Sequence, residues 1–111
     1  MKRDYKLYLS DIKECFLAIE EYLKGISVEE FMKSKLLQDG VMRRLEIIGE
    51  ASRNMPRAFK EVNKEIPWFD LSQFRDLMAH SYFEVSLSRV WKIAKEDIPQ
   101  LKEKFRRIKL V

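Results

Sequence analysis

The chain has 111 residues, of which 46% are hydrophobic and 36% charged, with three glycines, three prolines and a formal net charge of +4. This length allows one compact domain, which we expect to span residues 1–111, and excludes two. No apolar run is long enough to span a bilayer, and the N-terminus lacks the apolar core of a secretory signal, so we expect a cytoplasmic protein without membrane contact. The charge permits a polyanionic partner but does not require one.

The chain contains one cysteine and one histidine, which limits its metal and disulfide chemistry. Cys15 cannot form an intrachain disulfide and falls near an apolar stripe, so we interpret it as a packing residue rather than a nucleophile. One histidine and one cysteine do not supply the usual zinc ligand set. We therefore expect neither a metal nor a cofactor.

Apolar residues recur every three or four positions from residue 5 to residue 23, which predicts a long amphipathic helix ending near Gly25. Ser27 and Glu30 form a capping-box pattern that opens a short helix through about Ser34. A further helix is predicted over residues 35–54. Its buried side is marked by Leu37, Val41, Leu45, Ile48 and Ser52.

The helix predicted over residues 35–54 carries small residues and charges in its second half. Gly49 and Ala51 are small enough to let another helix approach closely, which explains a glycine that otherwise weakens a helix interior. Arg44 or Glu50 could border a cleft. The pattern favours the simpler alternative, a network of i,i+4 pairs with Glu46 and Glu50 within the same helix.

The second half of the chain continues the helical pattern. Pro56 marks the start of a short segment, and Asp70 is the predicted N-cap of a helix over residues 71–81. Ser86 or Ser88 caps the last helix, and Pro99 predicts either a kink or a fresh start within it. The sequence as a whole predicts an all-α fold, an up-and-down bundle of four or five helices.

The helix predicted over residues 71–81 buries one face and displays polar chemistry on another. Its apolar arc consists of Leu71, Phe74, Leu77 and Met78. Asp76 and His80 lie one turn apart on the opposite side, where the carboxylate could orient the imidazole. Arg75 can grip phosphate with two parallel N–H bonds, and a histidine can move protons near neutral pH. Together these groups would suit cleavage of a phosphodiester, with Ser81 or Tyr82 positioning the substrate.

The same pattern also has a purely structural interpretation. Asp76 and His80 could form a simple surface pair, and a histidine near a helix end often caps carbonyl groups. Spacing alone favours that interpretation. Arg75 and His80 also point about 140° apart on one helix, so a joint site requires a long reach by Arg75 or a second copy of the chain across a twofold axis.

The spacing Arg75-x4-His80-x-Tyr82 resembles the signature of the HepT-type toxins of the HEPN superfamily. Further segments resemble that family in the same order, so that residues 19–101 are covered. These segments are residues 26–31, residues 44–51, residues 66–68, residues 90–91 and residues 97–99.

The resemblance implies a HEPN-like homodimer that acts as a metal-independent RNA endonuclease. Arg75, His80 and Asp76 would be catalytic, and Ser81 and Tyr82 would bind substrate. Asparagine is frequent at the position of Asp76, and Gly-Met is frequent where this chain has Gln73-Phe74. The implied partner is a minimal nucleotidyltransferase antitoxin that neutralises the toxin by adding AMP to Tyr82.

Two other functions remain open from the sequence. The chain could be a non-catalytic helical subunit that docks a nucleotidyltransferase and helps to present its substrate. It could also be a plain dimerisation module whose polar motif is structural. The ordered resemblance favours the toxin-type ribonuclease over both.

Overall fold

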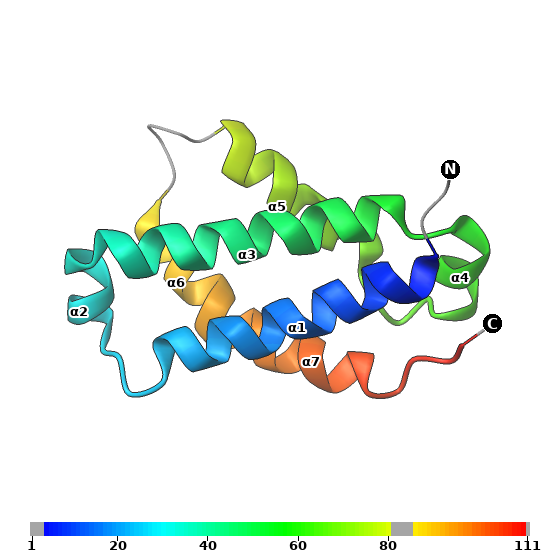
Figure 1. Cartoon of the computed structure of the whole chain (residues 1–111), viewed down its shortest axis with the longest axis horizontal. Coiled ribbons are helices and arrows are strands. Elements are labelled where there is room, and N and C mark those ends of the chain that lie inside the picture. Colours follow the sequence, from blue (N-terminus) through cyan, green and yellow to red (C-terminus); the bar gives the residue numbers. More distant parts are fainter. Residues whose placement is uncertain (1–3, 81–85, 111) are drawn as a thin grey trace.

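A computed structural model of the chain describes residues 4–80 and 86–110, and the side chains of residues 79 and 80 lie outside the description. Four long helical segments build the fold (Figure 1). They are α1 (Tyr5–Leu23), α3 (Lys35–Asn54), α5 (Trp68–His80) and a C-terminal run of α6 (Leu87–Lys92), a π-helical turn η1 (Ile93–Asp97) and α7 (Ile98–Phe105). The short helices α2 (Val28–Lys33) and α4 (Arg57–Val62) connect them. The predicted all-α bundle is confirmed.

Local hydrogen bonds at the start of α2 explain why this helix begins where the sequence predicted. The Ser27 side chain accepts from the N–H of Glu30 at 3.1 Å, and the Glu30 carboxylate accepts from the N–H of Ser27 at 2.9 Å. This reciprocal pair is the predicted capping box. Gly25 has a φ of +72°, which an L side chain rarely adopts, and it follows the end of α1.

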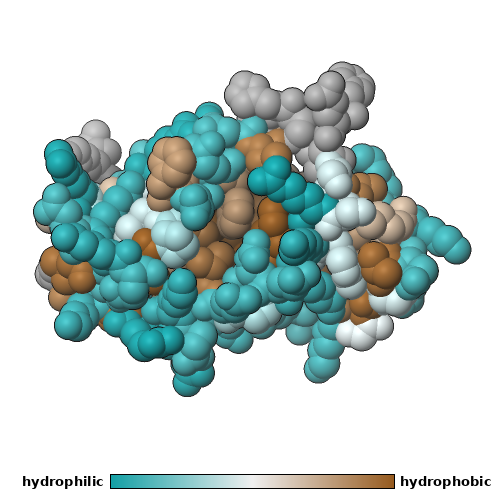
Figure 2. Space-filling view, turned by 180° about the vertical axis from the view of Figure 1, so that it is seen from behind, coloured by the Kyte–Doolittle hydropathy of each residue, from teal (hydrophilic) through white to brown (hydrophobic). Residues whose placement is uncertain are grey.

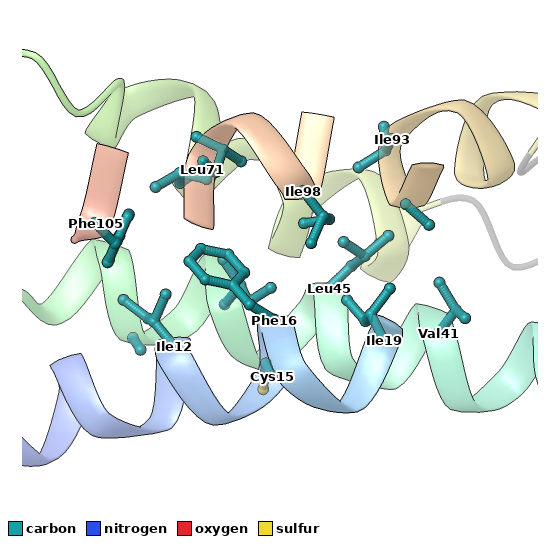
Figure 3. Packing of buried hydrophobic residues seen from close by; sticks show 14 of the residues in the cluster. Ile12, Cys15, Phe16, Ile19, Val41, Leu45, Leu71, Ile93, Ile98 and Phe105 are labelled. Carbon is teal, nitrogen blue, oxygen red and sulfur yellow. The ribbon is translucent and has the colours of Figure 1, made fainter. Parts of the chain in front are cut away.

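The hydrophobic core lies where α1, α3, α5 and the C-terminal run meet (Figure 3). Ile12, Phe16 and Ile19 project from α1 toward Val41 and Leu45 of α3. The Phe16 ring also packs edge-on against Phe105, with ring centroids 5.0 Å apart. Within the described part of the chain, no helix is both long enough and apolar enough to cross a membrane.

Helices α3 and α5 approach each other closely where Gly49 faces Arg75. A Cβ atom added at Gly49 would lie 2.4 Å from the backbone nitrogen of Arg75 and 2.8 Å from its Cβ. Such distances are far inside van der Waals contact, so only glycine allows the two helices to pack here. The prediction that Gly49 lets a neighbouring helix approach is confirmed, and α5 is that helix.

The helix containing Arg75 begins earlier than predicted, so the assignment of Asp70 as its N-cap is wrong. α5 starts at Trp68, and Asp70 lies in its first turn. The carbonyl of Pro67 accepts from the N–H of Leu71 at 3.0 Å, so the turn closes directly after the proline. Pro67 keeps the residue before it out of the α region and has a φ suited to a helix start. Ser81, the predicted last residue, lies outside the described residues.

The C-terminal run stays helical past Pro99. Five residues form the π-helical turn, and Pro99 is the second residue of α7. The backbone of Asp97 and Ile98 is already helical, so the chain makes no fresh start at Pro99, and a π-helical turn precedes the proline instead. The predicted cap is Ser86, whose side chain accepts from the N–H of Arg89 at 3.3 Å. Leu87 and Trp91, like Leu37 on α3, are half-buried rather than fully buried.

Gly49→Ala should destabilise the fold. The new methyl group would force α5 away from α3, at a cost of about 1–3 kcal/mol that outweighs the gain in helix propensity. Urea unfolding followed by circular dichroism measures the change. Gly40→Ala in the same helix is the control, because its Cβ would meet only the half-buried Tyr22 ring at 3.3 Å. Equal stability of the Gly49 variant and the parent would contradict the packing described here.

Candidate active site

Four charged side chains of alternating sign meet where α3 crosses α5, and we call them the Arg75 cluster: Glu50, Arg53, Arg75 and Asp76. The Arg75 Nε lies 2.5 Å from Glu50 Oε2 in an ion pair. The Arg53 Nη2 donates to Asp76 Oδ1 at 2.8 Å, and Arg75 Nη1 lies 3.7 Å from the same oxygen. Each helix contributes one acid and one base, so the cluster joins the helices by two ion pairs.

The backbone of Arg75 is fixed, whereas its charged end remains accessible. Its main chain packs against Gly49, and its side chain is 41% exposed. The Glu50 and Asp76 side chains are similarly accessible. Exposed ion pairs typically contribute no more than about 1 kcal/mol each. An incoming phosphate could therefore replace a carboxylate at Arg75 without loss of the fold.

The predicted i,i+4 network within α3 is wrong. Glu50 pairs across the helices with Arg75, and Glu46 pairs with Arg43. Arg44 donates to the Tyr22 hydroxyl at 3.2 Å and lies 3.9 Å from the Cys15 sulfur. Side chains from a crossing helix compete for the carboxylates, which a one-helix rule does not consider. Glu50 therefore lies at the border of the candidate site, which was the less favoured of the two alternatives for this residue.

Cys15 is buried, as its position on the apolar stripe predicted. Loss of solvation raises the pKa of the thiol above its ordinary value, although the hydrogen bond from Arg44 lowers it in part. A raised pKa keeps the sulfur as the unreactive thiol at neutral pH. Cys15 therefore belongs to the scaffold.

The remaining predicted site residues follow the cluster along the chain. His80 is the last residue of α5, one turn beyond Asp76, and its side chain lies outside the description. Ser81 and Tyr82 lie outside the described residues. Both described ion pairs of Asp76, with Arg53 and with Arg75, use its Oδ1 atom. Among the side chains that the structure describes, no group of three potential ligands could hold a metal ion.

Arg53 is the residue of the cluster that sequence reasoning did not single out. It lies 23 positions before Asp76, and no motif links the two. The spacing of Arg53 from Gly49 could have indicated its place in the cluster. A residue one helical turn beyond the glycine at a helix crossing lies beside the crossing helix.

The far side of α5 borders a hollow that separates it from α6 and η1. Its apolar floor includes Phe74, Leu77 and Ile93. Figure 2 shows apolar surface gathered in the middle of this face, with hydrophilic side chains around it. Phe74 and Leu77 are only half-buried, and Phe69 at the start of α5 is 73% exposed. Much of the predicted apolar arc of α5 therefore remains partly accessible in one copy of the chain.

Comparison with known proteins identifies a family and several relatives. The family model described as "Ribonuclease HepT-like" matches residues 12–108. A Thermococcus cleftensis protein named "Probable ribonuclease HepT" is 48% identical over 109 residues, which cover 98% of this chain and 99% of that protein. A Methanocaldococcus jannaschii protein named "Gamma-glutamylcyclotransferase and putative RNase MJ0434" is 45% identical over 108 residues, 97% of this chain and 49% of that protein. No solved structure gives a significant match.

These matches and the fold together define a helical ribonuclease of the HEPN type. The chain belongs to the HepT-like ribonuclease family.

Glu50→Gln should leave the fold nearly as stable as the parent. It removes one exposed ion pair, whose loss costs less than about 1 kcal/mol. Glu61→Gln is a matched control, because Glu61 also pairs with an arginine on an exposed surface, at 3.3 Å from Arg57. Thermal unfolding of both variants beside the parent makes the comparison. A much larger loss at Glu50 alone would mean that the cluster holds the helices together instead of serving the surface.

Proposed function

We propose that this ribonuclease is the toxin of a HEPN/MNT toxin–antitoxin pair, acting in the cytoplasm. Its site would be the Arg75-x4-His80-x-Tyr82 motif in a dimer cleft, and cleavage would need no metal. The observation that carries the proposal is the position in which Arg75 is held. Arg75 lies on α5, the helix that ends at His80. Its backbone packs on Gly49, and its partly exposed guanidinium forms an ion pair with Glu50 of α3.

Arg75 would bind the scissile phosphate. A guanidinium donates two parallel hydrogen bonds to phosphate oxygens and stays charged throughout the reaction. Charge builds on those oxygens as phosphorus becomes five-coordinate, so a cation in a fixed place stabilises the transition state more than the ground state. Glu50 would hold the guanidinium in orientation until the phosphate arrives.

His80 would move the protons. The substrate's 2′-hydroxyl loses its proton to an imidazole, and its oxygen attacks phosphorus. The bond from phosphorus to the 5′-oxygen then breaks, and that oxygen takes a proton from an imidazolium. The products are a 2′,3′-cyclic phosphate and a 5′-hydroxyl. Asp76, one turn before His80, would accept a hydrogen bond from the imidazole and orient it.

A homodimer would supply the two groups to one cleft. Since Arg75 and His80 point about 140° apart on α5, a twofold axis that brings two α5 helices together could set the arginine of one protomer near the histidine of the other. The partly accessible apolar residues on α5, Phe69, Phe74 and Leu77, support such a contact.

The partner in this proposal is a minimal nucleotidyltransferase antitoxin that adds AMP to Tyr82. Tyr82 lies two residues beyond His80 in the chain. An AMP group on its oxygen would bring a bulky anion next to the catalytic imidazole. It would compete with the RNA phosphate for Arg75 and block entry to the cleft.

The purified, antitoxin-free protein should cut total cellular RNA in EDTA into discrete fragments that end in cyclic phosphate. Arg75→Ala and His80→Ala should each lower the rate by about 100-fold or more, because each removes a transition-state contact or a proton carrier. Gel analysis and end-specific ligation measure fragments and ends.

Arg57→Ala is the control for Arg75→Ala, since Arg57 is an exposed arginine paired with a carboxylate on α4. Circular dichroism verifies the fold of each variant. Cutting by the His80 variant at the parent's rate would refute the proposal. No cutting by a parent whose Tyr82 is unmodified would favour the docking subunit of a nucleotidyltransferase.

Co-expression with a minimal nucleotidyltransferase of the proposed antitoxin class should add one AMP to Tyr82 and abolish cutting. Intact-mass and peptide mass spectrometry locate the adduct. Tyr82→Phe should escape modification, and the cutting that it retains on its own should be unchanged by co-expression with the enzyme. The modification proposal fails if the Tyr82→Phe protein still gains AMP or is still neutralised.

A further inference from the structure

A hollow of about 380 Å³ opens on the other side of the Arg75 cluster, between α1, α3 and α5. We call it the Tyr8 hollow. It is lined by Tyr8 and Asp11 from α1, by Arg43, Glu46, Ile47 and Glu50 from α3, and by Arg75. The volume is within the range of small-molecule pockets. Arg75 therefore belongs both to the proposed phosphate site and to the wall of this hollow.

The position of the Tyr8 hollow suits a nucleotide next to the scissile phosphate. A phosphate bound to Arg75 is covalently linked to a ribose on each side, and each ribose carries a base within one nucleotide's reach. Because Arg75 lines the hollow, a base beside a phosphate on its guanidinium would lie at the mouth of the hollow.

The walls of the hollow offer the two kinds of contact by which proteins read an unpaired base. Tyr8 and Ile47 provide an aromatic ring and an apolar side chain on which the flat face of a base can pack. Glu46 provides a carboxylate that forms an ion pair with Arg43 and is 36% exposed. A carboxylate accepts hydrogen bonds and donates none, so it favours a base edge that carries an amino group.

Resting on the ribonuclease function proposed above, we propose that the Tyr8 hollow binds the base next to the scissile phosphate. It selects bases with an exocyclic amino group over uracil. Cytosine presents its N4 amino group to the carboxylate of Glu46, whereas uracil presents a carbonyl oxygen in the same place and is repelled. Tyr8 contributes affinity for every base, and Glu46 contributes the choice between them.

The test measures binding without cleavage. Short 2′-O-methyl oligocytidine and oligouridine have no free 2′-hydroxyl to attack phosphorus, and their bases have the same ring size. The parent should bind oligocytidine about tenfold more tightly, the value of one good base contact. Competition against a labelled oligonucleotide by fluorescence anisotropy gives both affinities.

Glu46→Gln should bring the ratio of the two affinities close to one, because an amide both accepts and donates. Glu103→Gln is the matched control: Glu103 also pairs with an arginine three positions away, but on α7. It should keep the parent's ratio. Tyr8→Leu should weaken binding of both oligonucleotides, whereas Tyr8→Phe, which keeps the ring, should not.

A parent that binds the two oligonucleotides equally, or binds neither, overturns the assignment of the hollow. So does a Glu46→Gln protein that retains the parent's ratio. These binding results do not decide whether the protein cuts RNA. A parent that cuts RNA but shows no base preference keeps its nuclease function and loses the base site. A parent with a Glu46-dependent preference but no cutting keeps the hollow as a nucleotide-binding site.

Discussion

The contact between Gly49 and the backbone of Arg75 governs the arrangement of this protein. Only a residue without a side chain lets α5 lie this close to α3. The contact fixes the main chain of Arg75, so the guanidinium leaves the helix crossing at a defined point. Glu50 and Arg53, the neighbours of Gly49 on α3, then meet Arg75 and Asp76. The charged cluster is thus a consequence of one close packing contact.

The main chain of Arg75 is fixed by packing, whereas its guanidinium is partly exposed. This combination would allow the site to bind an anion. The core formed by α1, α3 and the C-terminal run lies beneath the crossing, and its aromatic and aliphatic side chains supply most of the stability (Figure 3). The charged groups above it are partly exposed and exchange partners at small cost. Binding of phosphate would therefore rearrange ion pairs without disturbing the helices that carry them.

Local signals in the sequence were enough for the helices but not for the site. The capping box at Ser27 and Glu30, the span of α3 and the role of Gly49 were all predicted, because each depends on neighbours in the chain. The Glu50–Arg75 and Arg53–Asp76 pairs were not, because they join residues more than twenty positions apart. The i,i+4 rule instead assigned Glu50 to its own helix. The predicted start of α5 came too late in the sequence, because aspartate is a residue type that commonly caps helices and Asp70 was therefore preferred to Pro67.

We propose that Arg75 of one protomer works with His80 of the other, and a mixed dimer separates this arrangement from a site within one chain. An Arg75→Ala chain and a His80→Ala chain carrying different tags are co-expressed, and the heterodimer is isolated. One of its two composite pairs then has both an intact arginine and an intact histidine. This heterodimer should cut RNA at a substantial fraction of the parent's rate, although each variant alone should be inactive. A heterodimer as inactive as its parts would mean that the arginine and the histidine must come from a single chain, and would rule out a site shared between protomers.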